Sequence, residues 1–198
     1  PEPTPAPTPE PTPEPEPEYE LPESIDDIDI SNLRFSYGTT GNDTLKGTKQ
    51  DDYIKTLNGN DLIKVKNGTN YILAGPGKDT IQGGKSTDLI FGEGGKDVLQ
   101  GNKGSDYFHG GPGNDKIKTG KGEDYVYISE GKDVVTDFDT AKDVLITGTG
   151  AEIKITQKKK FSRVELSGTG FENHSIKLNG VEASEIIIED SLRQSNAD

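Results

Sequence analysis

The stretch Gly110-Gly111-Pro112-Gly113-Asn114-Asp115-Lys116-Ile117-Lys118 is the clearest copy of a nine-residue pattern in the chain. In this frame, twelve consecutive blocks run from Gly38 to Leu145 with no insertion or deletion. The eighth position is apolar in every block and is occupied by Leu45, Ile54, Ile63, Ile72, Ile81, Ile90, Leu99, Phe108, Ile117, Val126, Val135 and Val144. A strict period of this kind predicts a solenoid, in which each block repeats the backbone path of the previous one.

The sixth position is aspartate in ten of the twelve blocks, and the exceptions are Asn70 and Lys142. The first six residues of a block are rich in glycine, which favours a tight loop with exposed carbonyl oxygens, and the last three predict a short strand. Carbonyl and carboxylate oxygens together suit Ca²⁺, which takes about six to eight oxygen ligands. Because stacked carboxylates repel one another without a cation, we expect metal binding and folding to be one event. Mg²⁺ fits less well because it demands tight octahedral geometry, and Zn²⁺ is unsuited to a chain with no Cys and two His.

The block Gly110–Lys118 resembles the Gly-Gly-x-Gly-x-Asp-x-U-x repeat of the RTX (repeats-in-toxin) family. The block Ala74–Gln82 is similar, with Ala74 in place of the first glycine, and Gly38–Leu45 resembles a typical opening of such repeats. The resemblance covers 108 of the 198 residues. It implies an all-β fold, namely a right-handed parallel β-roll of two sheets, with Ca²⁺ held between loops. It also implies export by a type I secretion system to the extracellular space.

In a β-roll two blocks make one turn, so loops of the same parity stack on one edge. The six odd loops all carry aspartate at the sixth position and glycine at the fourth, where we expect a positive φ. We therefore expect a full column of about five ions on this odd edge. The residues expected to form it are Asp43, Asp61, Gly75, Gly77, Asp79, Gly92, Gly95, Asp97, Gly110, Gly113, Asp115, Gly131 and Asp133.

The even loops depart from this pattern. Their fourth position includes Gln50, Ser86 and Thr140, and their third position is usually lysine. We expect fewer ions on the even edge, with lysines partly replacing missing cations. The sites predicted there involve Asp88, Asp106 and Asp124.

The strands that follow the even loops carry an aromatic outer face. Its members are Tyr53, Tyr71, Phe91, Tyr107, His109, Tyr125 and Tyr127. One interpretation is that residues 146–198, or Ile25–Phe35, cover this face; ladders of tyrosine also stabilise each other without a ligand. The other is a platform for sugar rings or a protein partner, assisted by Lys85, Lys103 and Lys121.

The composition divides the chain into four segments. Residues 1–18 have proline at every odd position from 1 to 17 and predict an extended linker, either a spacer or a ligand for a proline-binding domain. Residues 19–37 form an acidic bridge with a strand that caps the solenoid, residues 38–145 form the roll, and residues 146–198 form a C-terminal cap of short strands. Because the chain begins without Met, we expect a piece of a larger protein, with a catalytic or adhesive domain on the N-terminal side in cis.

Several functional classes are disfavoured. The two histidines, His109 and His174, have no neighbouring residues that suggest a triad, so we expect a non-catalytic module. A pI near 4.6 argues against nucleic acid, and no apolar run is long enough to span a membrane. Two hypotheses remain: a calcium-dependent structural and secretion module, or a module that binds an anionic polysaccharide or cell surface. In the second, the linker tethers the module to a polysaccharide-modifying enzyme.

Overall fold

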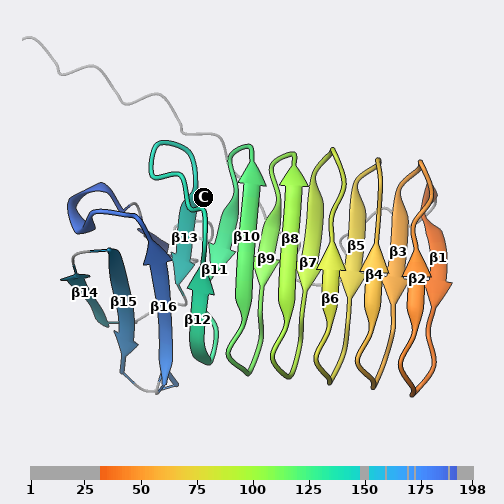
Figure 1. Cartoon of the computed structure of the whole chain (residues 1–198), viewed down its shortest axis with the longest axis horizontal. Coiled ribbons are helices and arrows are strands. Elements are labelled where there is room, and N and C mark those ends of the chain that lie inside the picture. Colours follow the sequence, from red (N-terminus) through yellow and green to blue (C-terminus); the bar gives the residue numbers. More distant parts are fainter. Residues whose placement is uncertain are drawn as a thin grey trace, which may run out of the picture.

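The computed structural model describes residues 32–147, 152–158, 160–168, 170–171, 173–186 and 188–190. Within these ranges the chain forms strands, loops and short 3-10 turns, among them η3 (Ala183–Glu185). The strands build two sheets that pack face to face, and both sheets extend along the long axis of the molecule (Figure 1). The expected all-β, two-sheet parallel roll is confirmed.

The first sheet carries the strands of the even blocks. Its order is β1 (Arg34–Tyr37), β3 (Asp52–Lys55), β5 (Asn70–Leu73), β7 (Asp88–Phe91), β9 (Tyr107–His109), β11 (Tyr125–Tyr127), β13 (Val144–Thr147) and β17 (Ile188–Asp190). All neighbours in this sheet pair in parallel.

The second sheet carries the strands of the odd blocks. Its order is β14 (Glu152–Lys158), β15 (Phe161–Ser167), β16 (His174–Asn179), β12 (Gly131–Val135), β10 (Lys116–Lys121), β8 (Val98–Lys103), β6 (Thr80–Gln82), β4 (Leu62–Lys64) and β2 (Thr44–Lys46). The pairs from β2 to β12 and the pair β12–β16 are parallel, whereas β14, β15 and β16 pair antiparallel.

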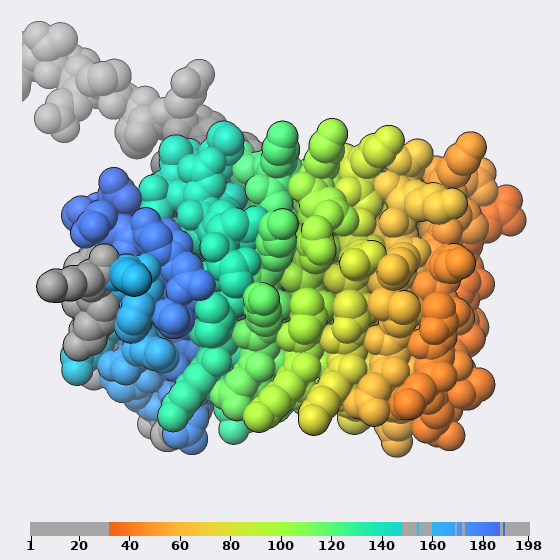
Figure 2. All heavy atoms as spheres, viewed as in Figure 1, coloured from red at the N-terminus to blue at the C-terminus, as the bar shows by residue number. Residues whose placement is uncertain are grey.

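Neighbouring strands pair with a register of 18 residues from β1 to β11 in the first sheet and from β2 to β12 in the second. Tyr53 lies opposite Tyr71, and Ile63 lies opposite Ile81. Each block therefore stacks on the block two positions later, as expected for a roll with two blocks per turn. Neighbouring turns lie directly against one another in the space-filling view (Figure 2).

The eighth-position side chains fill the space between the two sheets. From Ile54 to Val135 they are fully buried, with Phe108 the largest of them. Strands of three or four residues are too short to persist alone, so this continuous apolar column and the ladders on both sides hold them. Only Leu45, in the first odd strand, is partly buried.

The expectation of an uninterrupted frame is wrong in the last block. Val144 lies opposite Tyr125, and Leu145 lies opposite Val126 and is fully buried. Leu145 thus takes the inward place that the sequence frame assigned to Val144. The loop before β13 is one residue longer than the others, since the backbone N–H groups of Lys142 and Asp143 both donate to the carbonyl oxygen of Asp139 and form a tight turn.

The C-terminal strands continue the two sheets. β16 adds to β12, β17 adds to β13, and the hairpin β14–β15 extends beyond β16. The expectation that residues 146–198 fold over the aromatic face is not met by these strands, which pair edge to edge. At the other end of the roll, β1 pairs with β3, and residues 19–31 of the expected bridge lie outside the described residues.

Candidate metal centre

A ladder of aspartates runs along the odd edge. The backbone N–H of each aspartate donates to the Oδ1 atom of the aspartate in the next odd loop. The N···O distances lie between 2.7 Å, for Asp43 to Asp61, and 2.9 Å, for Asp115 to Asp133. These bonds fix the carboxylates inside the stack, so Asp61, Asp79, Asp97, Asp115 and Asp133 are all buried.

The even edge has a similar ladder. The N–H of Asp88 donates to Asp106 at 2.9 Å, and that of Asp106 donates to Asp124 at 2.9 Å. The N–H of Asp124 donates to Oδ1 of Asp143 at 3.2 Å. The sequence frame had placed Lys142 there, and the longer last loop puts Asp143 in its place instead. Asn70 is therefore the single departure from aspartate in the two ladders.

The second carboxylate oxygen, Oδ2, separates the aspartates into two groups. Six of these oxygens are buried and have no hydrogen-bond partner, and they belong to Asp61, Asp79, Asp97, Asp106, Asp115 and Asp124. A buried carboxylate oxygen with no donor is strongly unfavourable, because it has lost its water without replacement. A cation beside these atoms removes the penalty, so the residues fit a metal.

The remaining five aspartates have donors from their own loops, and two of them, Asp88 and Asp143, accept the backbone N–H groups of Gly84 and Asp139. The other three are Asp43, Asp52 and Asp133. The backbone N–H of Thr39 donates to Asp43, and that of Thr48 donates to Asp52, each at 2.6 Å. Oγ of Ser129 donates to Asp133 at 3.1 Å. These loops lie at the beginning of both ladders and at the end of the odd ladder. Sequence reasoning missed these donors, although a hydroxyl residue at the second position of the loop marks each of them.

Burial and mutual repulsion alter the ionisation of the ladder. Loss of water raises the pKa of Asp79 to about 6 and that of Asp97 to about 7, and neighbouring aspartates add to both shifts. On the even edge the same causes raise the pKa of Asp106 to about 8 and that of Asp124 to about 7. The roll without cations therefore holds its carboxylates in an environment that disfavours their charge.

Backbone carbonyl oxygens complete the surroundings of the carboxylates. A Cβ added to Gly92 would lie 2.6 Å from Oδ2 of Asp97 and 2.7 Å from the carbonyl oxygen of Gly110. The first glycine of the loop thus leaves open the space beside the unpartnered oxygen. Among the described residues, no three His, Asp or Glu side chains gather around one point, so carbonyl oxygens would have to supply many of the ligands. This all-oxygen donor set fits Ca²⁺.

Glycine at the fourth position of the odd loops has two causes. The expected positive φ is observed in three of the six odd loops, with values of 145° at Gly59, 151° at Gly95 and 131° at Gly131. Gly77 and Gly113 lie outside this region, and there a Cβ would overlap the carbonyl oxygen of the loop below. The close stacking of loops therefore requires glycine even where φ does not. Gly41 has no positive φ, and a Cβ there would meet only Oγ1 of Thr39 at 3.7 Å, so neither cause applies in the first loop. Gly75, at the second position of its loop, combines both causes, since its φ is 90° and a Cβ there would overlap the carbonyl oxygen of Leu57.

The aromatic face is largely withdrawn from solvent. Tyr53, Tyr71 and Tyr125 are only 5–6% exposed. The rings stack along the sheet, with centroids 5.7 Å apart for Tyr53 and Tyr71 and 4.8 Å apart for Tyr107 and Tyr125. The half-buried members of the row are Phe91, Tyr107, His109 and Tyr127.

The lysines expected to assist this face lie elsewhere. Lys85, Lys103 and Lys121 are exposed and lie at the third position of the even loops. Lys103 and Lys121 are the last residues of β8 and β10, in the sheet opposite the one that carries the aromatic row. Lys85 and Lys103 line a groove of about 450 Å³ together with Lys49 and Lys66. The structure therefore separates the aromatic row from the basic row.

A parallel β-roll whose loops carry buried aspartate ladders defines a class of calcium-binding repeat modules. The sequence matches the model of the family described as RTX calcium-binding nonapeptide repeat at residues 37–72, 66–99 and 100–135. The chain belongs to this family. No curated protein gives a significant match to it.

The solved structures that are similar to this chain include the following two. One is the extracellular lipase LipA from Serratia marcescens, with 18% identity, coverage of 77% of this chain and 39% of the lipase, and a TM-score of 0.37. The other is the AlgE6R3 subunit from the Azotobacter vinelandii mannuronan C5-epimerase, with 18% identity, coverage of 81% and 82%, and a TM-score of 0.40. The chain thus spans well under half of the lipase.

Proposed function

We propose that this chain is a calcium-dependent module that folds when Ca²⁺ binds outside the cell and thereby supports the secretion and stability of a larger extracellular protein. The observation that carries the proposal is the set of six buried Oδ2 atoms without a donor. At each of these positions the fold buries a carboxylate oxygen without a hydrogen-bond donor, so a cation is needed to balance its charge.

The proposed ions on the odd edge lie beside Asp61, Asp79, Asp97 and Asp115, with carbonyl oxygens of adjacent loops as further ligands. Asp43 and Asp133 close this column, and up to about five intervals between stacked loops are available. On the even edge the proposed ions lie beside Asp106 and Asp124. Asp88 is a weaker candidate than expected, because its Oδ2 accepts the N–H of Gly84 at 2.6 Å.

In this proposal, the Ca²⁺ concentration determines whether the module is folded, and this concentration differs between the inside and the outside of the cell. At low Ca²⁺, as inside a cell, repulsion within the ladders opposes stacking, and an unfolded chain passes through a narrow export channel. At the higher Ca²⁺ outside, ligand binding stabilises the folded state by mass action. In this proposal the module is non-catalytic, and catalytic or adhesive activity belongs to a domain joined through residues 1–18. The described residues contain no helix long and apolar enough to cross a membrane.

The test is a Ca²⁺ titration followed by far-ultraviolet circular dichroism at neutral pH. We expect little strand signal in excess chelator and a cooperative rise as Ca²⁺ is added, with Mg²⁺ at the same concentration as the control. A chain that is fully folded in chelator, or that responds equally to Mg²⁺, would contradict the proposal.

A second candidate function is binding of an anionic polysaccharide or cell surface by the exposed lysines on the even edge. The observation in its favour is the groove lined by Lys49, Lys66, Lys85 and Lys103. Stacking of sugar rings on the aromatic row is less well supported, since three of its tyrosines are buried. Loss of alginate binding by the calcium-loaded Lys85→Glu/Lys103→Glu variant would support this function, and unchanged binding would exclude it.

A further inference from the structure

Asn70 is fully buried in the even ladder, at the position that every other loop gives to aspartate. Its side-chain Oδ1 accepts the N–H of Asp52 at 3.1 Å, as an aspartate would. Its Nδ2 donates to the carbonyl oxygen of Gly68 at 3.0 Å, to that of Asn67 at 3.4 Å and to Oδ1 of Asp88 at 2.6 Å. One amide nitrogen thus lies among three oxygen acceptors.

The acceptors around this nitrogen are two loop carbonyls and one carboxylate of the next loop. Carbonyl and carboxylate oxygens are also the ligands that we propose for Ca²⁺ elsewhere in the ladders. At Asp106 and Asp124 the corresponding side-chain atom is a buried Oδ2 without a donor. At Asn70 the corresponding atom is Nδ2, which donates hydrogen bonds to the surrounding oxygen atoms.

We propose that the side-chain amide of Asn70 takes the place of a calcium ion and leaves the N-terminal half of the even edge free of metal. This inference rests on the proposed function, because it assumes that Ca²⁺ binds the loops that keep their unpartnered carboxylate oxygens. It assigns the even-edge ions to the loops of Asp106 and Asp124.

The loops on both sides of Asn70 support this division. Asp52 accepts the N–H of Thr48 at 2.6 Å and its Oγ1 at 3.0 Å. Asp88 accepts the N–H of Gly84 at 2.6 Å as well as the Asn70 amide. In the first three even loops, the carboxylates of Asp52 and Asp88 and the amide of Asn70 all have hydrogen-bond partners within the protein. The unpartnered carboxylate oxygens begin only in the next even loop, at Asp106.

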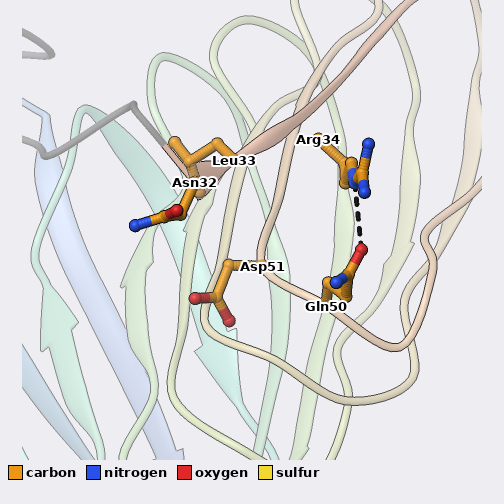
Figure 3. A pocket seen from close by; sticks show the side chains of 5 residues that line it. All are labelled: Asn32, Leu33, Arg34, Gln50 and Asp51. Carbon is orange, nitrogen blue, oxygen red and sulfur yellow. Dashed lines mark hydrogen bonds between the residues drawn. The ribbon is translucent and has the colours of Figure 1, made fainter.

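The first even loop also accepts a side-chain hydrogen bond from the neighbouring strand β1. Nε of Arg34, in β1, donates to Oε1 of Gln50 at 2.9 Å, beside Asp51 (Figure 3). Gln50 occupies the fourth position, which is glycine in all six odd loops. At the fourth position, the first even loop therefore makes a side-chain hydrogen bond that the glycines of the odd loops cannot make.

The test is the Asn70→Asp variant, with bound Ca²⁺ counted by native mass spectrometry and by equilibrium dialysis with metal analysis. We expect one more ion per chain than in the wild-type protein, because the variant replaces a donor with a buried carboxylate oxygen. The matched control is Asn60→Asp, which makes the same chemical change at an exposed position of an odd loop and should leave the count unchanged. An unchanged count in Asn70→Asp overturns the inference and leaves the proposed function standing.

The reverse variant, Asp106→Asn, covers the case in which Asn70→Asp does not fold. An amide at position 106 should replace an ion, so we expect one ion fewer and a folded protein in saturating Ca²⁺. If Asp106→Asn binds as many Ca²⁺ ions per chain as the wild-type protein, the inference is overturned. A wild-type protein that binds no Ca²⁺ at all would instead refute the proposed function, and the inference with it.

Discussion

The two oxygens of a ladder aspartate have different roles. Oδ1 accepts a backbone N–H from the preceding loop of the same edge, which makes the carboxylate part of the stack. Oδ2 either meets a donor of its own loop or meets none. Fold and metal binding therefore depend on different atoms of one side chain, and substitutions can separate them.

The first prediction compares Asp97→Asn with Asp52→Asn. Asparagine keeps Oδ1 as an acceptor in both, but only Asp97 has an Oδ2 without a donor. We expect Asp97→Asn to raise the midpoint of the Ca²⁺ titration by about tenfold or more and to reduce its cooperativity, while Asp52→Asn causes a much smaller change. The titration by circular dichroism measures both, and the opposite ranking would refute the assignment of the odd edge as the main metal column.

The second prediction concerns the close approach of the loops. A Cβ on Gly77 would overlap the carbonyl oxygen of Gly59, whereas a Cβ on Gly94 would meet nothing within 4 Å. We expect Gly77→Ala to destabilise the calcium-loaded protein by about 3 kcal/mol or more, and Gly94→Ala to change stability by less than about 0.5 kcal/mol. Urea denaturation in saturating Ca²⁺ provides both values. Equal effects would show that the loops can separate to admit a side chain.

Single residues also show which features of the fold and the site could be predicted from the sequence. The inward residues and the aspartate ladders could be predicted, because a strict period fixes which side chains stack. The extra residue before β13 could not, because the apolar run Val144-Leu145-Ile146 satisfies either frame. The pairing of β13 with β11 and the hydrogen bonds of Asp139 and Asp143 decide between the two frames. The donors of Thr39 and Ser129 were likewise hidden, since their effect depends on loop geometry.

At the scale of elements, each strand depends on its neighbours. The strands between the two ends have partners on both sides, and their one inward side chain touches the column formed by the opposite sheet. A defect in this column therefore affects several turns together. The predicted C-terminal strands illustrate the limit of local patterns: alternation indicated strands there, but not that β16 and β17 would join different sheets.

The third prediction removes the largest member of the column. Phe108 is fully buried, whereas Val98 is 44% exposed on the outer side of the odd sheet. We expect Phe108→Ala to cost about 3–5 kcal/mol, and Val98→Ala to cost less than about 1 kcal/mol. Chemical denaturation at saturating Ca²⁺ tests this difference. A small effect of Phe108→Ala would mean that the turns do not share a common core.

At the scale of the whole molecule, the ladders make stability depend on pH. The folded pKa values of Asp79, Asp97 and Asp106 are raised to about 6, 7 and 8, above the value of 3.8 for a free aspartate. Groups with a raised folded pKa favour the folded state when protonated, so their contribution is complete below about pH 4 and is lost as pH rises through 6 to 8.

The fourth prediction follows from this sign. Without calcium, we expect strand content to be highest in mild acid and to fall between about pH 5 and pH 8, whereas saturating Ca²⁺ should hold the fold at pH 8. Circular dichroism of the metal-depleted chain across this range is the measurement. Strand content that increases with pH in the absence of metal would contradict it.

The register of 18 residues also governs how such a chain can change its length. Duplicating or deleting 18 residues, such as 74–91, joins loops of the same parity and keeps every ladder in phase. Deleting nine residues, such as 74–82, keeps the inward column but moves each later strand to the opposite sheet. The aromatic row would then be split between two faces, and the aspartates of the two edges would exchange partners. Genetic variation in the length of this molecule should therefore proceed in whole turns.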